Sequence, residues 1–303
     1  MRKLFILAMC FVLVSLFIAF CSKDTSSPQE NNSLTDLSGP YLGQTPPGTS
    51  PVKFAEGIIS TGRDWGITFS PDGKECFFTR NTGRPSILTC KEENGKWTRP
   101  AAASFSAPYN EIEPHITTDG NILYYGSERP LPGTSSTSLH QWYVEKTGSG
   151  WSESGTMDAP LKDIFMMYPS VADNGNMYFT ASDDPAADQW ISVSRLVNAS
   201  YQEPEKLSDN INDKNFPAHP FIAADESYII FDVVPGSNVG IRELFISFKN
   251  QDGTWGIPVS LHDRLDVGTE TACPFVTRDG LYLFFEHDGD IYWVNAGIID
   301  TLM

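Results

Sequence analysis

Hydrophobic and polar positions repeat along this chain with a period of about 50 residues. In each copy a short apolar stretch, usually begun by a proline, leads to an Asp-Gly or similar pair and then to an aromatic-rich apolar run. The five segments read GITFSPDGKECFF, EPHITTDGNILYY, YPSVADNGNMYF, HPFIAADESYIIF and CPFVTRDGLYLFF. An Asp-Gly pair between two apolar runs is a strong hairpin signal. The pattern therefore predicts five β-hairpins of similar construction.

Two further strands follow each predicted hairpin. The third strands are expected at residues 86–90, 139–144, 189–194, 243–248 and 290–294. A fourth is marked by an aromatic residue with proline three positions later, at Trp97/Pro100, Tyr201/Pro204 and Trp255/Pro258; Trp151 has Ser154 in the proline place. Four strands in about 50 residues make one propeller blade. A β-sandwich with coincidental Asp-Gly turns is the alternative, but it does not explain five copies that align in four columns.

The fifth copy ends after its third strand, and its missing strand is found at the other end of the repeat region. Pro51-Val52-Lys53-Phe54 resembles the outer strands of the other copies. Pairing the two ends closes a ring and removes exposed sheet edges. We therefore predict an all-β fold: a five-bladed β-propeller of four-stranded antiparallel blades over residues 51–303, closed by an N-terminal strand.

These repeats resemble the Pro-Asp-Gly repeats of the WD-like propeller family that includes the C-terminal domain of the periplasmic Tol-system propeller (TolB-like). Residues 244–258 look like that family's outer-strand segment, and residues 41–48 look like the opening of its secreted bacterial members. The resemblance implies a propeller and a secreted location. It implies no single reaction, because propellers serve as binding modules and as enzymes.

The first 20 residues have the character of a signal peptide. Arg2 and Lys3 precede an uncharged apolar run over residues 4–20, which ends at Cys21. This junction resembles a bacterial lipobox, although Phe20 is bulkier than the residue usually found before the cysteine. We predict a signal peptide at 1–20, lipidation of Cys21, a flexible tether at 21–50 and an extracytoplasmic location, anchored at the outer membrane. An uncleaved anchor and an ordinary signal peptide are the alternatives.

Charge and cysteine content narrow the functional classes. Acidic residues outnumber basic ones 38 to 21, for a net charge of −17. Such a surface repels phosphate backbones, so nucleic acid is not an expected partner. Cys76, Cys90 and Cys273 lie within the repeats. If Arg80 pairs with Pro85, Cys76 and Cys90 point to opposite faces and a disulfide needs a shifted register; three buried free thiols are the alternative.

A site is expected where the loops that lead into the inner strands meet at one end of the central channel. The Asp-Gly turns lie at the other end, and we interpret Asp72, Asp119, Asn174, Asp225 and Asp279 as turn formers. Polar and aromatic residues at the first end vary between copies and are candidates for ligand binding: Asp64, Trp65, Glu111, Glu113, His115, Tyr168, His219 and Glu270. No catalytic residue, metal or cofactor is predicted. His115 and His219 with Glu111 or Glu113 are the metal alternative, but no close ligand spacing supports it.

Two functions remain open on the sequence. The first is a monomeric, lipid-tethered binding module for a protein, peptide or glycan. The second is a carbohydrate-active enzyme that uses two carboxylates across the channel mouth, with Asp64, Glu111, Glu113 and Glu270 as candidates. An acid pair about 5 to 9.5 Å apart in an open pocket distinguishes the second.

Overall fold

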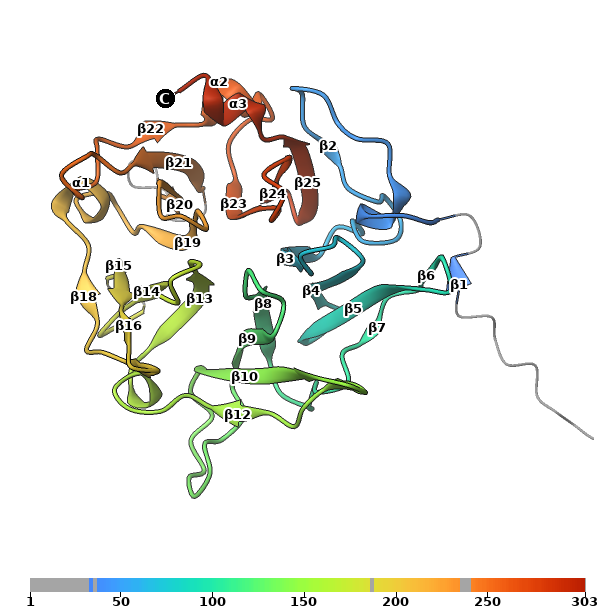
Figure 1. Cartoon of the computed structure of the whole chain (residues 1–303), viewed down its shortest axis with the longest axis horizontal. Helices are drawn as coiled ribbons and strands as arrows, with labels where there is room; N and C mark the ends of the chain where they lie inside the picture. The colour runs from blue at the N-terminus through green and yellow to red at the C-terminus, as the bar shows by residue number, and fades with distance from the viewer. Residues whose placement is uncertain (1–32, 35–36, 186–187, 235–240, 303) are drawn as a thin grey trace, which may run out of the picture. The chain divides into compact units, whose positions relative to one another are not determined.

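The computed structural model describes residues 33–34, 37–185, 188–234 and 241–302, and in them five antiparallel sheets form a ring around a central axis (Figure 1). The fold is nearly all-β, with 45% strand and 7% helix. The predicted five-bladed propeller is therefore confirmed. The expected signal peptide, Cys21 and the first part of the expected tether lie outside the described residues.

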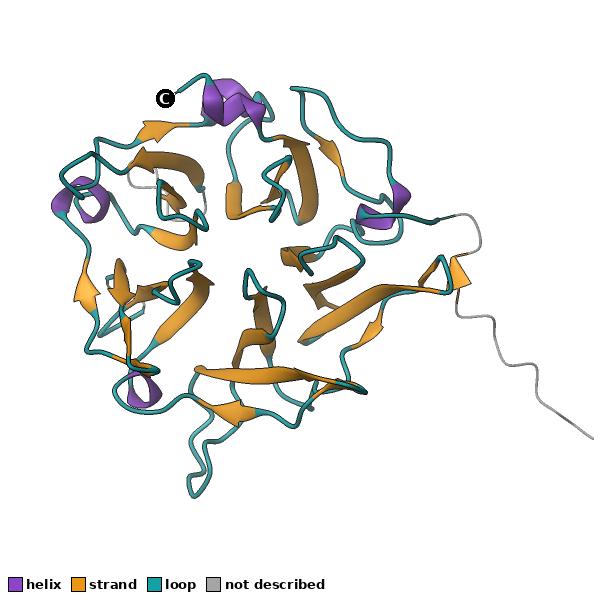
Figure 2. Cartoon of the chain, viewed as in Figure 1, coloured by secondary structure: helices purple, strands orange, loops and turns teal. Residues whose placement is uncertain are grey.

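Each blade has four strands, from the axis outwards (Figures 1 and 2). The blades are, in order, β3 (Asp64–Phe69), β4 (Glu75–Asn81), β5 (Pro85–Glu93) and β7 (Ala101–Ala102); β8 (Glu111–Ile116), β9 (Ile122–Ser127), β10 (His140–Thr147) and β12 (Gly155–Thr156); β13 (Met166–Val171), β14 (Met177–Ala181), β15 (Trp190–Ser194) and β18 (Glu205–Lys206); β19 (Ala218–Ile222), β20 (Tyr228–Val233), β21 (Glu243–Phe248) and β22 (Val259–Ser260); and β23 (Thr271–Val276), β24 (Tyr282–His287), β25 (Asp290–Asn295) and β2 (Val52–Lys53).

Short strands and single helical turns lie outside the four-stranded blades. They are β1 (Ser33–Leu34), β6 (Lys96–Thr98), β11 (Gly150–Trp151), β16 (Leu196–Val197) and β17 (Ser200–Tyr201), together with single helical turns η1 (Tyr41–Gly43), η2 (Leu161–Asp163), α1 (Asp209–Asn212), α2 (His262–Leu265) and α3 (Gly297–Asp300). No helix within the described ranges has the length and apolar character needed to cross a membrane.

The ring closes as the sequence predicts. Val52 pairs with Trp293 and Lys53 with Tyr292, so β2 is the outer strand of the fifth blade. Phe54 follows, donates its backbone N–H to the Ile291 carbonyl and is fully buried. Its ring packs edge-on against Phe69, Phe284 and Trp293, so the first and last blades share one aromatic core.

The outer strands begin directly after the predicted proline, not at the aromatic residue before it. Trp97 lies in β6 and Tyr201 in β17, each in a short hairpin, and Trp255 forms an isolated bridge with Lys249. The outer strands start one residue after Pro100, Ser154, Pro204, Pro258 and Pro51. Pro51 thus occupies the same column as the other prolines, which explains why the sequence comparison located the closing strand.

Every inner strand contains a bulge at its proline column. The pairing register shifts between Trp65 and Thr68, and at the equivalent place in the other four blades. Proline has no N–H to give to the ladder, so a bulge is where a strand can hold it. The residue before the proline has positive φ in all blades: Gly66 58°, Glu113 57°, Tyr168 51°, His219 47° and Cys273 53°.

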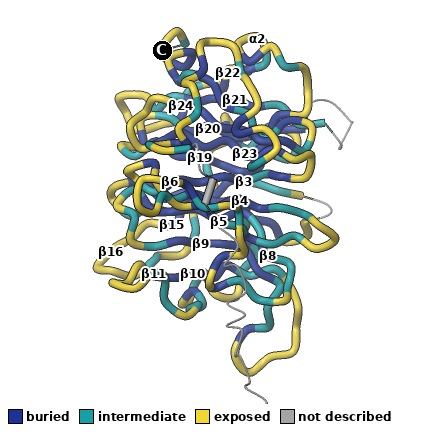
Figure 3. The backbone as a smooth tube through the Cα atoms, turned by 90° about the vertical axis from the view of Figure 1, so that its right-hand side faces the viewer, coloured by how far each residue is buried: buried dark blue, intermediate teal, exposed yellow. Residues whose placement is uncertain are grey.

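The core lies between the blades and the loops form the two exposed ends (Figure 3). The flexible tether that we expected over residues 21–50 does not extend to residue 50, because its last part packs on the propeller. Tyr41 and Leu42 are buried, and the Tyr41 hydroxyl donates to the Asp279 carboxylate at 2.9 Å. The Trp97 indole N–H also donates to the Gly39 carbonyl at 2.7 Å. This segment packs on the propeller because its apolar side chains cover the junction of the first and last blades.

The first hairpin has a different register from the one considered above. Asn81, not Arg80, pairs with Pro85, and Cys76 therefore lies directly opposite Cys90. The two side chains share one buried face, yet both thiols are free, as is that of Cys273. Burial and the neighbouring Cys90 raise the pKa of Cys76, so these thiols behave as small apolar side chains in the core.

Candidate functional site

The central channel has a pocket at each end. We call the end formed by the segments leading into the inner strands the loop mouth, and the end formed by the Asp-Gly turns the turn mouth. The loop-mouth pocket has a volume of about 480 Å³ and contains Arg63, Asp64, Trp65, Asn81, Glu113, His219, Arg242, Ala272, Cys273, Glu286 and Gly289. Its size lies within the range of small-ligand sites.

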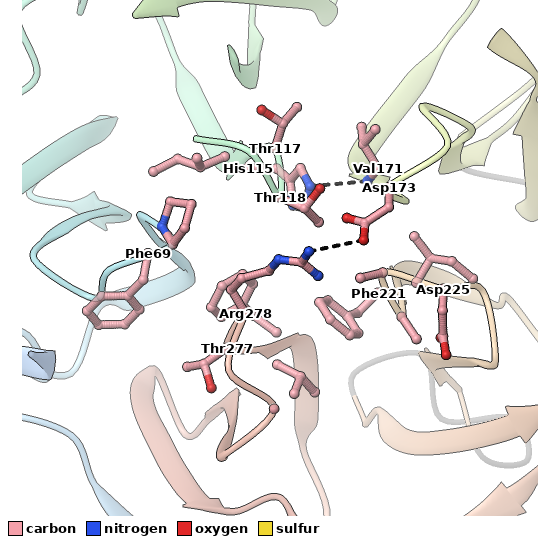
Figure 4. A pocket seen from close by; sticks show the side chains of 18 of the residues that line it. Phe69, His115, Thr117, Thr118, Val171, Asp173, Phe221, Asp225, Thr277 and Arg278 are labelled. Carbon is pink, nitrogen blue, oxygen red and sulfur yellow. Dashed lines mark hydrogen bonds and ion pairs between the residues drawn. The ribbon is translucent and has the colours of Figure 1, made fainter. Parts of the chain in front are cut away.

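The turn-mouth pocket is about 360 Å³ and is lined by residues from all five blades, among them Phe69, Thr117, Val171, Phe221 and Thr277 (Figure 4). Arg278 reaches across it to Asp173, at 3.0 Å between the guanidinium and the carboxylate. The turn aspartates here accept local hydrogen bonds, such as those from Asn121 N–H to Asp119 and from Leu281 N–H to Asp279. They are turn formers, as predicted. The loop-mouth pocket contains arginine, carboxylate, imidazole, thiol and indole side chains, and we therefore consider it the candidate site.

The floor of the loop mouth is built from the positive-φ positions of the inner strands. Blades two, four and five place Glu113, His219 and Cys273 there, and blade one has Gly66, where a side chain would contact the Glu113 backbone. A non-glycine residue with positive φ costs free energy, about 1–3 kcal/mol each, and such strain clusters at functional sites. The bulge therefore turns side chains of different blades towards one another.

A buried chain of polar groups leads from this floor towards the fourth blade. The Nε2 atom of His219 lies 3.7 Å from Oε1 of Glu113, and its Nδ1 lies 2.6 Å from Oδ2 of Asp232. Arg242 donates to the other Asp232 oxygen. The Cys273 backbone N–H points at Asp232 as well, at 3.3 Å. Asp232 is fully buried and is thus held by an imidazole, a guanidinium and an amide.

Burial shifts the pKa values of these groups in different directions. Burial raises the pKa of Glu113 despite the nearby His219, and it raises the pKa of Glu286 to about 7. For His219 burial acts downwards, but the Asp232 carboxylate outweighs it and raises the pKa. For Asp232 burial acts upwards, but His219 and Arg242 lower the pKa. The charged forms of His219 and Asp232 therefore stabilise each other, whereas burial disfavours the ionised forms of Glu113 and Glu286.

Four of the eight predicted site residues meet in this pocket: Asp64, Trp65, Glu113 and His219. Tyr168 lies just below, with its ring 5.2 Å from that of His219 and its hydroxyl donating to the Pro274 carbonyl. Asp64 lines the pocket wall but is fully buried and occupied, since it accepts from Arg80 at 2.5 Å and from Thr61. Its role is to fix the strand and the preceding loop.

Three predicted residues lie elsewhere. Glu111 is fully buried and accepts from Arg129 at 2.8 Å and from the Ala107 N–H. His115 accepts the Val171 N–H through Nε2, and burial lowers its pKa to about 4. It occupies the column of Thr68 and Ser170, whose hydroxyls accept inner-strand N–H groups of the next blade. Glu270 is exposed and does not line the pocket.

The sequence reasoning missed Asp232, Arg242 and Glu286. Two of them had a signal: the residue after the aromatic pair of each second strand is Thr79, Gly126, Thr180, Asp232 or Glu286. Thr79 and Thr180 accept the N–H of the bulge residue in the next blade, at 2.8 and 2.9 Å. Asp232 performs the same task for Cys273 and adds a charge. The sequence signal for Asp232 and Glu286 was thus an acidic residue at a position where two other blades have threonine.

Among the described residues, one set of three can offer close ligand atoms to a metal ion: Glu113, His219 and Cys273, with ligand atoms within 4.8 Å of one another. His115 is not in this set, so the histidine pair considered from the sequence does not form.

Comparison with known proteins agrees with the fold. No protein-family model matches the chain, and no curated protein matches its sequence. Among solved structures, the endo-arabinase from Bacteroides thetaiotaomicron VPI-5482 is similar, with a TM-score of 0.54 at 13% identity over 78% of this chain and 95% of that one. TolB from Acinetobacter baumannii is similar with a TM-score of 0.43 at 16% identity, over 66% of this chain and 46% of that one. The chain thus spans less than half of the TolB chain. At these identities the likeness shows the propeller fold alone.

Proposed function

We propose that this protein is a lipid-anchored, extracytoplasmic binding module that holds a protein, peptide or glycan in the loop-mouth pocket. The observation that carries the proposal is the state of two fully buried acids, Asp64 in the pocket wall and Asp232 beside the pocket residue His219. Asp64 and Asp232 each have an arginine partner and further donors, so they shape the pocket and are not free to react. The half-buried Trp65 provides an aromatic face beside them, as binding sites for sugars or peptide side chains require.

The acidic surface supports a neutral or basic ligand. A net charge of −17 becomes −19 if residues 1–20 are removed with Arg2 and Lys3. Such a surface attracts cationic groups and repels nucleic acid. Arg63 at the pocket rim is exposed and adds a local donor for a carboxyl or carbonyl group of the ligand.

The test compares the two ends of the channel. The purified chain is screened on a glycan array and used to capture partners, in parallel with Trp65→Ala and Arg278→Ala. We expect Trp65→Ala to weaken binding at least tenfold, whereas Arg278→Ala at the turn mouth leaves it unchanged. Equal binding by all three proteins places the ligand elsewhere. Loss of binding in Arg278→Ala alone moves the site to the turn mouth.

The second candidate function is a carbohydrate-active enzyme. It is favoured by two carboxyl groups that line one pocket, Glu113 and Glu286, because a glycosidase uses a pair of carboxyl groups. Burial raises the pKa of Glu286 to about 7, which suits the general acid of such a pair. Of the four acids first considered, Asp64 and Glu113 line the pocket, and Asp64 is paired with Arg80. Turnover of oligosaccharides that is lost in both Glu113→Gln and Glu286→Gln supports this function, and binding without turnover supports the first.

A further inference from the structure

We propose that Glu113, His219 and Cys273 form a binding site for a divalent transition metal of the zinc class at the floor of the loop mouth. The three residues occupy the same bulge position in blades two, four and five. Each contributes a different ligand type, a carboxylate oxygen, an imidazole nitrogen and a sulfur, and these atoms lie within 4.8 Å of one another.

The distances are close to those of a tetrahedral site. Zinc binds oxygen and nitrogen at about 2.0–2.2 Å and sulfur at about 2.3 Å, which separates neighbouring ligand atoms by about 3.3–3.8 Å. The Glu113 oxygen and His219 Nε2 are 3.7 Å apart. Side-chain movements of about an ångström therefore bring all three atoms into bonding distance, with no change in the backbone.

The surroundings of His219 match those of a metal-bound imidazole. Metal-ligating histidines usually donate their second ring N–H to a carboxylate, which fixes the tautomer and the ring orientation. Asp232 holds Nδ1 of His219 at 2.6 Å, and Arg242 neutralises the remaining charge of Asp232. Nε2 faces Glu113 and the pocket, and it offers its lone pair to a metal ion that displaces its proton.

Glu113 supplies an independent sign that a ligand is needed. Its side chain is more than nine-tenths buried and lines the pocket, and Oε2 has no hydrogen-bond partner among the described residues. The Trp65 indole affects the pKa of this carboxyl but does not reach hydrogen-bond geometry with Oε2. Buried polar atoms are almost always satisfied, and an exception calls for an explanation such as a bound ion.

The donor set selects the class of metal. Calcium and magnesium take oxygen ligands almost exclusively, whereas a thiolate with an imidazole suits zinc and its neighbours in the first transition row. Three protein ligands leave the fourth position directed at the 480 Å³ pocket, where water or a ligand can bind the ion. The site does not depend on the identity of the pocket's ligand, because it rests on the three side chains alone.

The test uses Co²⁺ as a spectroscopic probe in the full-length chain, purified in detergent and stripped with a chelator. We expect one Co²⁺ per chain, with a thiolate-to-cobalt charge-transfer band and the intense visible bands of a tetrahedral site, and displacement of both by Zn²⁺. Cys273→Ala should abolish the charge-transfer band. His219→Gln should weaken binding at least 100-fold. Cys76→Ala, which removes a buried thiol of the first blade, should keep the wild-type spectrum.

Several outcomes overturn the proposal. One is the absence of a charge-transfer band in the wild type. Another is a charge-transfer band that persists in a folded Cys273→Ala variant, because the metal is then bound by another thiol. If Cys273→Ala does not fold, Glu113→Gln decides, because the amide keeps the size of the side chain. Unchanged Co²⁺ affinity and spectrum in that variant also overturn the proposal. Failure of the glycan and partner screen leaves the metal result untouched, so the two proposals fail separately.

Discussion

Glu226 shows how one side chain can link two blades. It occupies the turn position where the other four repeats have glycine, and its φ is 60°. Its carboxylate accepts from Asn176 at 2.8 Å and Tyr178 at 3.0 Å in the third blade and from Lys249 at 2.8 Å in its own. Glu226 is therefore a junction between the third and fourth blades.

This junction should depend on pH. Burial alone would raise the pKa of Glu226, but the bonds from Lys249, Asn176 and Tyr178 outweigh it and lower the pKa to about 2. A lowered pKa contributes stability that is present above the ordinary value of 4.5 and is lost as the pH falls towards 2. We expect Glu226→Gln to be about 1–2 kcal/mol less stable at pH 7, with the gap narrowing below pH 4.5. Urea denaturation at pH 7 and pH 3, with exposed Glu203→Gln as control, measures this; a constant gap contradicts it.

Asp64 tests whether a candidate site acid is structural. Removing one partner of a buried ion pair leaves an uncompensated charge and costs about 3–5 kcal/mol. Asp64 is fully buried against Arg80, so Asp64→Ala should destabilise the domain by that amount in chemical denaturation. Asp183→Ala, at an exposed loop residue, is the control, with a change below about 0.5 kcal/mol. If both variants are equally stable, Asp64 is not a structural residue, and a direct role in ligand binding becomes the better explanation of its position.

At the scale of single residues, the sequence located candidate side chains but not their hydrogen-bond and ion-pair partners. Charge and position were enough to find Asp64, Trp65, Glu113 and His219 at the loop mouth. They could not show that Arg80 and Arg129 neutralise Asp64 and Glu111, because those contacts depend on side-chain reach across strands and loops. His115 has the polarity of a ligand, yet its column shows a blade-to-blade hydrogen bond that only the assembled ring creates.

At the scale of elements, the hydrophobic pattern predicted the three inner strands of each blade and the ring closure. The second and third strands of each blade appear where the aromatic runs and Asp-Gly turns place them. The register of the first hairpin was not predictable, since the bend at residues 82–84 decides whether Arg80 or Asn81 faces Pro85. The N-terminal segment was also misjudged: Tyr41 and Leu42 are two apolar residues in a polar stretch, too few to be recognised as buried without the surface that they cover.

The closing strand should be required for stability. Phe54 is fully buried among aromatic rings of the first and last blades, whereas Val52 on the same strand is 45% exposed. Truncating a buried phenylalanine costs about 3–5 kcal/mol. We expect Phe54→Ala to lose that amount and Val52→Ala less than about 0.5 kcal/mol, measured by chemical denaturation. If the two variants unfold together, the outer strand contributes little to ring closure.

At the scale of the whole molecule, the ring of blades and the tether that we expect from the sequence would have separate tasks. The blades hold the loop-mouth pocket in a fixed geometry, because each inner strand is hydrogen-bonded to its neighbour blade through side-chain hydroxyls and backbone amides. The N-terminal part of the sequence would determine where that pocket is presented. If the N-terminus is lipidated as we propose, the acidic propeller would be held close to a membrane, and ligands that diffuse along that surface would reach it at a higher effective concentration.

The expected membrane anchor rests on the sequence alone. Cys21 follows two basic residues and an uncharged apolar run and precedes a polar stretch. Each buried methylene of an acyl chain adds about 0.8 kcal/mol to membrane affinity, and two or more chains give stable anchoring. We expect Cys21→Ser to block acyl attachment and the cleavage that follows it. Palmitate labelling and detergent partitioning, with Cys76→Ser as the control thiol, measure this. If wild type and Cys21→Ser both partition into the aqueous phase without label, the propeller is released after ordinary cleavage; if both stay uncleaved in the membrane, residues 4–20 form the anchor themselves.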